Sequence, residues 1–399
     1  MKTIALLENR IQNYEWGSLT AISELLGREP SGLPEAELWL GAHRKSPSSV
    51  SWRQSEIALD KQITRDPETI LGREILSRFG ASLPFLFKVL ASAKPLSIQV
   101  HPSREQARAG FARENAAGLP LDAPDRNYRD DNHKPEVIVA VTPFWALKGF
   151  RPVAEIAATF GEIDSGTIAD TLWLLHAGTG SEGLRKFFTE IMTMDRARQH
   201  ALADDIVSAA RAGRGSADHH QWIIRLNELY PGDVGLACAL LLNLVLLKPG
   251  EGLFLPAGEL HAYLEGTGVE LMANSDNVLR GGLTPKHIDV PELLATLTFE
   301  PGRPELLTPQ ARGPAESVYA TPAEEFELST VDLDGSESWI SPRKRGVEIL
   351  LGVEGDGAIL DCGTDETLTI GKGTAILVPA AVSRYRISGT VRLYRTVVP

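Results

Sequence analysis

Strand-like runs separated by turns dominate the sequence between residues 83 and 150. The segment "LPFLFKVLASAKPLSIQVH" at 83–101 holds two apolar runs, rich in aromatic and β-branched residues, joined by a short turn that contains Pro95. Strand character resumes in "PEVIVAVTPFWALKGF" at 135–150, and the spacing of the apolar residues changes abruptly near Pro152. The pattern predicts β-structure that stops at about residue 151.

A helical pattern follows over residues 152–232. Apolar residues recur there at positions i, i+3, i+4, i+7 and i+8, namely Leu184, Phe187, Phe188, Ile191 and Met192. This spacing places them on one face of an α-helix, where they can pack against a core. The sequence therefore predicts a helical domain inserted into the β-structure.

Strand-like runs return after the helical region. The segment "LVLLKPGEGLFLPAGELHAYLEG" at 244–266 contains two short strands around a Pro-Gly turn, and later runs such as "VEILLGVEGDGAILD" continue the pattern. We therefore expect a mainly β protein with an α-helical insertion. Its predicted divisions are one β-domain in two parts, 1–151 and 233–315, the insertion at 152–232, and a second β-domain at 316–399.

Composition and charge narrow the class of protein. The 399-residue chain is 43% hydrophobic and 23% charged, which is ordinary for a folded globular protein. Its formal net charge of -12 argues against a surface dominated by nucleic-acid or anionic-membrane binding, although a local basic pocket can still hold an anion. The longest apolar run, at 235–247, is shorter than the roughly 20 residues that span a bilayer.

The two cysteines, Cys238 and Cys362, lie far apart in the sequence. They indicate neither a disulfide framework nor a cysteine zinc site, and such sparse cysteine usage is typical of an intracellular protein. We expect a cytoplasmic protein without a membrane or nucleic-acid partner.

The stretch "LSIQVHP" at 96–102 places two polar, metal-capable side chains in an apolar strand. Gln99 and His101 are two residues apart, so they face the same side of a strand and lie about 6 to 7 Å apart along it. Glu136, directly after Pro135, opens another strand and offers a carboxylate, a common zinc ligand together with histidine. Taken singly, Gln99 or His101 is more often a satisfied strand-end residue than a ligand.

A further histidine lies in a segment that resembles a cupin motif. The motif consists of Gly250, Pro256, Gly258, His261 and, where an asparagine is more usual, Glu265. Cupins are small antiparallel β-barrels, and the resemblance implies that His261 is a metal-binding residue that points into such a barrel. Gln99 and His101 are then expected to point into the same interior.

The same pattern recurs weakly near the end of the sequence. In the segment that starts at Gly371, five residues separate Gly373 from Pro379, as five separate Gly250 from Pro256, and Arg384 stands at the place of the histidine. If both copies have the same fold, the second has lost a metal ligand, and we expect it to be structural.

Six segments carry a closer resemblance. They are "NYEWG" at 13–17, "AELWLGAH" at 36–43, "PLSIQVHP" at 95–102, "HKPE" at 133–136, "GELHAYLEG" at 258–266 and "VELMANSDNVLRGGLTPK" at 269–286. They span most of the first 290 residues in family order, and on them the chain resembles the type I mannose-6-phosphate isomerase family. The C-terminal third is less distinctive.

The resemblance implies one zinc ion per chain, held by Gln99, His101, Glu136 and His261, and a catalytic arginine at Arg280. It also implies a cupin-type antiparallel β-barrel catalytic domain, a helical inserted domain and a C-terminal cupin-like β-domain, which agrees with the divisions above. The expected partner is a small phosphosugar, and the chain is expected to be a monomer.

Members of that family interconvert mannose 6-phosphate and fructose 6-phosphate by moving a proton between C1 and C2 through an enediol intermediate. The reaction needs a base, a stabiliser of the developing oxyanion and a grip on the phosphate. His133 and Lys134, close to Glu136, are the candidates for proton transfer, and Arg280 can hold an oxyanion or the phosphate. Asp276 is expected to orient His133 or Arg280. The expected pocket lining is Trp16, Glu37, Lys94, Tyr263 and Glu270.

Three other functions remain open from the sequence. A cupin isomerase for a different phosphosugar would keep the same ligands. A cupin dioxygenase would need redox-active iron, and a set of glutamine, two histidines and glutamate departs from the facial triad of two histidines and one carboxylate. A non-catalytic protein would bind the phosphosugar without turnover, and Arg280 and Lys134 argue against that alternative.

Overall fold

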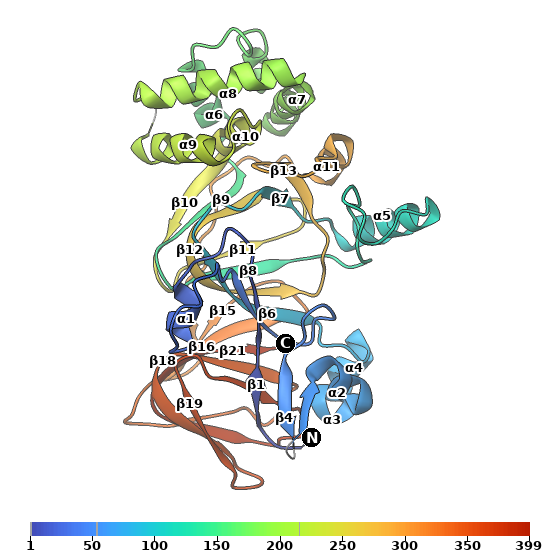
Figure 1. Ribbon diagram of the computed structural model, residues 1–399, viewed down its shortest axis with the longest axis vertical. Helices are drawn as coiled ribbons and strands as arrows, with labels where there is room; N and C mark the ends of the chain where they lie inside the picture. Colours follow the sequence, from blue (N-terminus) through green and yellow to red (C-terminus); the bar gives the residue numbers. More distant parts are fainter. Residues whose placement is uncertain (1, 53–54, 215) are drawn as a thin grey trace.

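The computed structural model describes residues 2–52, 55–214 and 216–399. Within these residues the chain forms three parts along its long axis: a group of helices, an antiparallel sheet of ten strands and an antiparallel sheet of eleven strands (Figure 1). This group of helices lies at one end of the molecule and the eleven-stranded sheet lies at the other (Figure 1).

The elements have the following bounds. The ten-stranded sheet contains β2 Arg10–Gln12, β3 Glu37–Leu40, β6 Phe85–Ser92, β7 Ile98–Val100, β8 Glu136–Ala140, β9 Phe144–Phe150, β10 Leu242–Leu247, β11 Gly252–Leu255, β12 His261–Ala273 and β13 Leu279–Gly282. The eleven-stranded sheet contains β1 Ala5–Glu8, β4 Ser49–Trp52, β5 Ser55–Ala58, β14 Gln310–Ala311, β15 Glu316–Tyr319, β16 Glu327–Asp334, β17 Trp339–Ile340, β18 Glu348–Asp361, β19 Thr367–Gly371, β20 Ala375–Val378 and β21 Tyr385–Val397.

The helices fall into two sets. The group at one end consists of α6 Val153–Gly161, the 3-10 helix η1 Leu172–His176, α7 Gly180–Thr193, α8 Arg196–Arg211, α9 Ala217–Leu229 and α10 Gly235–Leu241. The others are α1 Ala21–Leu25, α2 Leu59–Arg65, α3 Pro67–Leu71, α4 Arg73–Phe79, α5 Arg104–Ala116 and α11 Val290–Thr296. In the described part of the chain, none of the helices has the length and apolar character that a bilayer crossing requires.

Strand β12 belongs to both halves of the ten-stranded sheet. Near its start, His261 lies opposite Gln99 of β7 and Lys148 of β9. Near its end, Met272 lies opposite Glu136 of β8. A register shift within β12 marks the change from one set of partners to the other. Strand β12 therefore brings side chains of β7 and β9, at its start, and of β8, at its end, toward one interior.

Alternation along β7 separates packing residues from polar ones. Ile98 and Val100 are completely buried in a core that includes the helical group. Gln99 lies between them in the sequence and so points to the opposite face, and His101 continues that face beyond the end of the strand. This is the arrangement that the alternating pattern predicts.

The apolar stripe predicted for the insertion forms the buried face of α7. Its five residues, Leu184, Phe187, Phe188, Ile191 and Met192, are all buried. The ring of Phe188 meets the ring of Phe150 on β9 edge to face, with 5.5 Å between their centroids. The predicted packing role is confirmed, and the helices cover the outer face of the strands that carry Gln99 and His261.

The two sheets share a hydrophobic core. Phe87 and Leu271 of the ten-stranded sheet belong to the same buried cluster as Ile349 and Leu377 of the eleven-stranded sheet. Strand β1 joins the eleven-stranded sheet by pairing with β20, and β4 and β5 follow it there, although all three lie within residues 1–151. The domain boundaries drawn from the sequence stay a prediction.

The repeated cupin pattern is shifted by one residue from the expected alignment. His261 is the first residue of β12, which follows β11, and Tyr385 is the first residue of β21, which follows β20. Tyr385 therefore occupies the place of the histidine in the second copy, and Arg384 lies one residue before it.

Helix α5 contains a glycine whose substitution tests close packing. A methyl group added at Gly110 would lie 2.3 Å from the ring of Tyr128, whose hydroxyl donates a hydrogen bond to Glu292. Gly110→Ala is expected to lower the free energy of unfolding by about 1–3 kcal/mol, because overpacking outweighs the better helix propensity of alanine. Urea titration measures the change.

The control is the exposed neighbour Ala109, where helix propensity alone should set the sign of the change in unfolding free energy. Ala109→Gly is expected to cost about 1 kcal/mol. A stabilising effect of Gly110→Ala would show that the contact with Tyr128 does not restrict this position.

Candidate metal centre and active site

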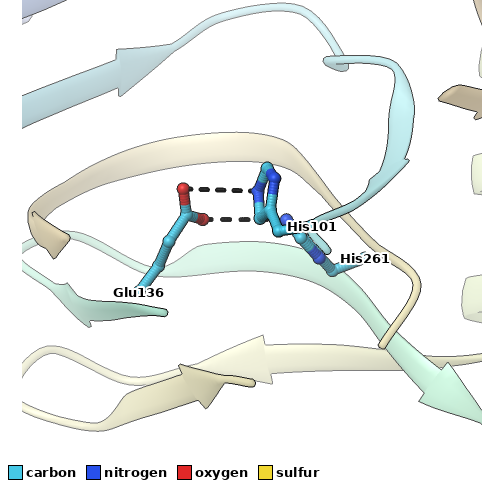
Figure 2. A group of neighbouring side chains, drawn as sticks. All are labelled: His101, Glu136 and His261. Carbon is cyan, nitrogen blue, oxygen red and sulfur yellow. Dashed lines mark ion pairs between the residues drawn. The ribbon is translucent and has the colours of Figure 1, made fainter. Parts of the chain in front are cut away.

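Three buried side chains converge in the interior of the ten-stranded sheet (Figure 2). His101 follows β7, Glu136 begins β8 and His261 begins β12. Nε2 of His101 lies 3.4 Å from Oε1 of Glu136, and Nε2 of His261 lies 3.7 Å from Oε2. One ligand atom from each of the three residues lies within 4.8 Å of the others. The cluster thus directs two nitrogens and a carboxylate at one point.

Backbone carbonyl groups orient both imidazole rings. Nδ1 of His101 lies 2.8 Å from the carbonyl oxygen of Asn277, and Nδ1 of His261 lies 3.0 Å from that of Glu259. A hydrogen on each Nδ1 donates to its carbonyl and leaves the lone pair of Nε2 facing Glu136. This is the tautomer that a metal-binding histidine needs.

The charge state of the cluster also fits a cation. Burial lowers the pKa of His261 to about 3 and lowers that of His101, so both rings are neutral near pH 7. Burial alone would raise the pKa of Glu136, but Lys134 and the histidines outweigh it and hold this pKa well below its ordinary value. Nε2 of both rings and Oε2 of the carboxylate are buried without a hydrogen-bond partner in the described structure. A divalent cation would satisfy all three atoms.

Gln99 and Arg280 lie beside this cluster in strand register. Gln99 is opposite His261 of β12 on one side and opposite Arg280 of β13 on the other. Directly opposed residues of antiparallel strands point to the same face, so the three side chains form a row across the sheet. Gln99 is therefore placed to join the two histidines and Glu136.

A second buried charge cluster lies on the same interior face. Nζ of Lys88 is 2.9 Å from Oε2 of Glu270 and 3.5 Å from Oε1 of Glu37. The indole Nε1 of Trp39 donates to the other oxygen of Glu37 at 2.7 Å. Burial alone would lower the pKa of Lys88, but the carboxylates of Glu270 and Glu37 outweigh it and raise this pKa above its ordinary value. Lys88 is therefore a fixed ammonium.

The remaining predicted lining residues occupy different places. Tyr263 is buried, and burial together with the carboxylates of Glu270 and Glu136 raises the pKa of its hydroxyl. Trp16 is half-buried and packs against the apolar cluster that contains Tyr263. The side chain of Lys94 is exposed, and its backbone N–H donates to the carbonyl of Trp16 at 3.2 Å. The structure does not bring the Lys94 side chain to the two charge clusters.

Lys134 joins the metal cluster, and Asp276 has partners that differ from those expected. Nζ of Lys134 lies 2.9 Å from Oε1 of Glu136. Asp276, expected to orient His133 or Arg280, instead accepts from Nζ of Lys45 at 2.9 Å and lies 3.6 Å from Nε2 of His43. Lys45 was not predicted, because its partner lies far along the sequence.

His133 is turned toward the C-terminal part of the chain. Its Nε2 lies 2.7 Å from Oε1 of Glu325, and a guanidinium nitrogen of Arg104 contacts the same oxygen. These contacts differ from the proton-transfer place expected for His133 next to Lys134. In the described structure the side chain of Lys134, but not that of His133, forms an ion pair with Glu136.

Arg280 belongs to a basic group that the sequence indicated only in part. Burial and the nearby charge of Arg129 lower the pKa of Arg280, and burial, Arg280 and Arg129 lower that of Lys286. Within the described residues, none of the three side chains forms an ion pair with a carboxylate. Neighbouring cations without a countercharge favour an anionic ligand.

Sequence reasoning missed Lys88, although a signal was present. Lys88 is the single charged residue of the strand "FLFKVLAS", in which every residue is buried. A lysine in a fully buried strand must be paired, and Glu37 and Glu270 were already expected in the pocket. Lys45 and Arg129 lie in loops and had no comparable signal.

Comparisons with known proteins agree over the whole chain. Residues 4–153 match the family model described as "Phosphomannose isomerase type I, catalytic domain", and residues 169–242 match "Phosphomannose isomerase type I, helical insertion domain". The mannose-6-phosphate isomerase of Shigella flexneri is 44% identical over 395 residues, covering 98% of each chain. The chain belongs to the type I phosphomannose isomerase family. The resemblance inferred from the six sequence segments is confirmed.

Solved structures of family members have the same fold. A mutant phosphomannose isomerase from Salmonella typhimurium matches with a TM-score of 0.93 at 39% identity, over 99% of both chains. Mannose 6-phosphate isomerase from the same organism, bound to fructose 6-phosphate and zinc, matches with a TM-score of 0.91 over the same share of each chain. The predicted fold class, mainly antiparallel β with a helical insertion, is confirmed for this phosphomannose isomerase family member.

The buried Lys88 cluster makes a pH-dependent stability prediction. Lys88→Met leaves the carboxylates of Glu37 and Glu270 without their cation, and breaking a buried pair in this way costs about 3–5 kcal/mol. Burial already raises the pKa of Glu270 against the opposing effect of Lys88, so losing Lys88 raises it further. In the folded variant the carboxyl of Glu270 then holds its proton more tightly than it does in the unfolded chain. The free energy of unfolding therefore falls as the pH rises above the pKa of this carboxyl in the unfolded chain.

Urea titrations at pH 5 and pH 8 measure the difference. We expect Lys88→Met to lose more unfolding free energy than the wild type over this interval, and the double variant Lys88→Met/Glu270→Gln to recover part of the loss at pH 8. An equal pH dependence in Lys88→Met and wild type would contradict the buried-pair explanation.

Proposed function

We propose that this chain interconverts mannose 6-phosphate and fructose 6-phosphate and uses one zinc ion held by Gln99, His101, Glu136 and His261. The observation that carries the proposal is the set of three buried ligand atoms within 4.8 Å of one another, none of which has a hydrogen-bond partner in the described structure. Family membership supports it, because a Salmonella typhimurium relative of the same fold was solved with fructose 6-phosphate and zinc.

The donor set is suited to zinc. Two neutral imidazoles, one carboxylate and one amide leave the site with net positive charge when a divalent cation is bound. Such an ion supplies positive charge that can polarise or position sugar oxygens. The amide ligand distinguishes the set from the facial triad of two histidines and one carboxylate in iron oxygenases, so the dioxygenase alternative has less support.

The basic group of Arg280, Arg129 and Lys286 is proposed to hold the anionic end of the substrate. Arg280 stands in register with Gln99, so one side of this group borders the metal cluster. Its guanidinium is planar and can form two parallel hydrogen bonds with a phosphate or a developing oxyanion. Besides burial, the charge of Arg129 lowers the pKa of Arg280 and the charges of both arginines lower the pKa of Lys286, and a bound anion would relieve that repulsion.

Lys134 is proposed to move the proton between C1 and C2 through an enediol intermediate. Its Nζ lies 2.9 Å from a carboxylate oxygen of Glu136, at the edge of the cluster that would hold the sugar oxygens. Lys88 is less suited to act as the base, because Glu270 and Glu37 hold it as an ammonium. It can instead place a fixed positive charge beside the reacting carbons.

Metal removal tests the zinc dependence. A coupled assay follows fructose 6-phosphate formation from mannose 6-phosphate in native, chelator-stripped and zinc-restored protein. Activity should disappear with the metal and return with zinc, because without the ion the site has no metal charge to polarise or position the sugar oxygens. Undiminished activity in the stripped protein, with metal content verified, would refute the metal-dependent mechanism. Parallel assays with other aldose phosphates separate this proposal from an isomerase for a different phosphosugar.

Substitutions separate the proposed roles of Arg280 and Lys134. Arg280→Ala is expected to lower kcat/KM by about 10²–10³, the usual cost of a lost charge-stabilising donor. Lys134→Met is expected to lower kcat by about 10²–10⁴ with a smaller change in KM, as for the loss of a general base. Exposed Lys94→Met is the control and should keep near-native kinetics. A Lys134→Met enzyme with native kcat would exclude Lys134 as the base, and substrate binding without turnover by wild type would favour the non-catalytic alternative.

A further inference from the structure

We propose that Glu325 is a positioning residue that fixes, from the C-terminal domain, two of the three ligand-bearing segments of the active site, those of His101 and Glu136. The proposal rests on the zinc site argued above. It assigns a role to the His133 side chain and gives the C-terminal domain a part in metal binding and catalysis.

One carboxylate oxygen connects three parts of the chain. Oε1 of Glu325 lies 2.7 Å from Nε2 of His133 and is also contacted by a guanidinium nitrogen of Arg104. That guanidinium nitrogen lies 2.8 Å from Nε2 of His133. Both donors therefore meet at a single acceptor, and Oε2 of Glu325 has no hydrogen-bond partner in the described structure.

Each side chain that contacts Glu325 lies three residues along the sequence from a proposed metal ligand. Arg104 comes three residues after His101, and His133 comes three residues before Glu136. Neither segment can move freely without breaking a contact to Glu325. The carboxylate thus holds together, from outside the cluster, the two segments whose side chains lie 3.4 Å apart inside it.

Both segments are stiff enough to transmit this constraint. Ser103 caps the helix that begins at Arg104 through a reciprocal pair of hydrogen bonds with Gln106. On the other side, Pro135 fixes one backbone angle between Lys134 and Glu136. Lys134 is the direct neighbour of His133, so the position of the proposed base depends on the same contact.

Glu325 itself is firmly anchored. Its side chain is 2% exposed. The next residue, Phe326, is buried in the core shared by the two sheets, directly before β16. The carbonyl of the preceding residue, Glu324, accepts a hydrogen bond from Arg78 at 3.0 Å. An anchored acceptor can hold two partners in place, whereas an exposed ion pair would contribute little.

The experiment compares zinc affinity and kinetics in substituted full-length proteins. Glu325→Ala removes the acceptor, and Glu325→Gln keeps an acceptor oxygen without the charge. Glu316→Gln is the matched control, because Glu316 is also a buried C-terminal carboxylate, but it pairs with Arg395. The zinc dissociation constant is measured by competition with a chelating dye, and kcat and KM are measured with mannose 6-phosphate. Thermal unfolding confirms that each variant is folded.

Glu325→Ala is expected to weaken zinc binding and lower kcat by about tenfold each, the lower range found when groups that orient metal ligands are lost. KM should change less than kcat, because the substrate-binding cations are untouched. Glu325→Gln should recover part of both losses, and Glu316→Gln should resemble wild type. Native zinc affinity and kcat in Glu325→Ala, or equal losses in Glu316→Gln, would overturn the proposal. If Glu325→Ala does not fold, native values in Glu325→Gln and in His133→Ala would overturn it.

A double-mutant cycle with His133→Ala sharpens the test. If His133 acts through Glu325, the double variant should lose no more zinc affinity than the stronger single variant. Fully additive losses would show that the two residues act independently and would contradict the proposed connection. Because zinc affinity is measured without substrate, this readout remains valid even if the chain acts on a different phosphosugar.

Discussion

The buried negative charge of Glu136 is the constraint on which the catalytic half of the protein depends. An ionised carboxylate removed from water costs several kcal/mol unless charges and donors surround it. Lys134 lies 2.9 Å from one of its oxygens, and the Nε2 atoms of His101 and His261 approach both. The register of β7, β8 and β12 must therefore be kept, because a slip of one residue would turn each side chain to the opposite face.

The rest of the fold keeps that register and excludes water. The helical group covers the outer face of the strands whose inner face carries the site, as the burial of Ile98 and Val100 beside Gln99 shows. The eleven-stranded sheet closes the structure from the other end through a shared core that includes Phe87 and Ile349. The helical insertion and the second sheet thus help to bury His101, Glu136 and His261, and burial strengthens the electrostatic interactions among them.

The sequence predicts features that depend on local spacing. Alternation places Gln99 and His101 on one face, and the helical period identifies the buried face of α7. Pairings between distant charged residues carry no local signal, so the sequence did not indicate the contacts of Asp276 with Lys45 and His43. The contact of His133 with Glu325 spans 192 residues and joins the loops that precede β8 and β16, two strands of different sheets. Such a contact is set by tertiary packing, and only the fold reveals it.

The eleven-stranded sheet shows how the equivalent strand position is stable without a metal. Glu348, like Glu136, begins a strand opposite the residue that precedes the motif proline, and Tyr385 stands where His261 stands in the first copy. The guanidinium of Arg395 donates to both oxygens of Glu348, at 2.8 and 3.0 Å, and Tyr385 donates its hydroxyl to the same carboxylate. Arg395 thus supplies in the second sheet the positive charge that the proposed zinc ion supplies in the first. A buried carboxylate that is paired with an arginine side chain of the same protein needs no metal ion, which agrees with one metal per chain.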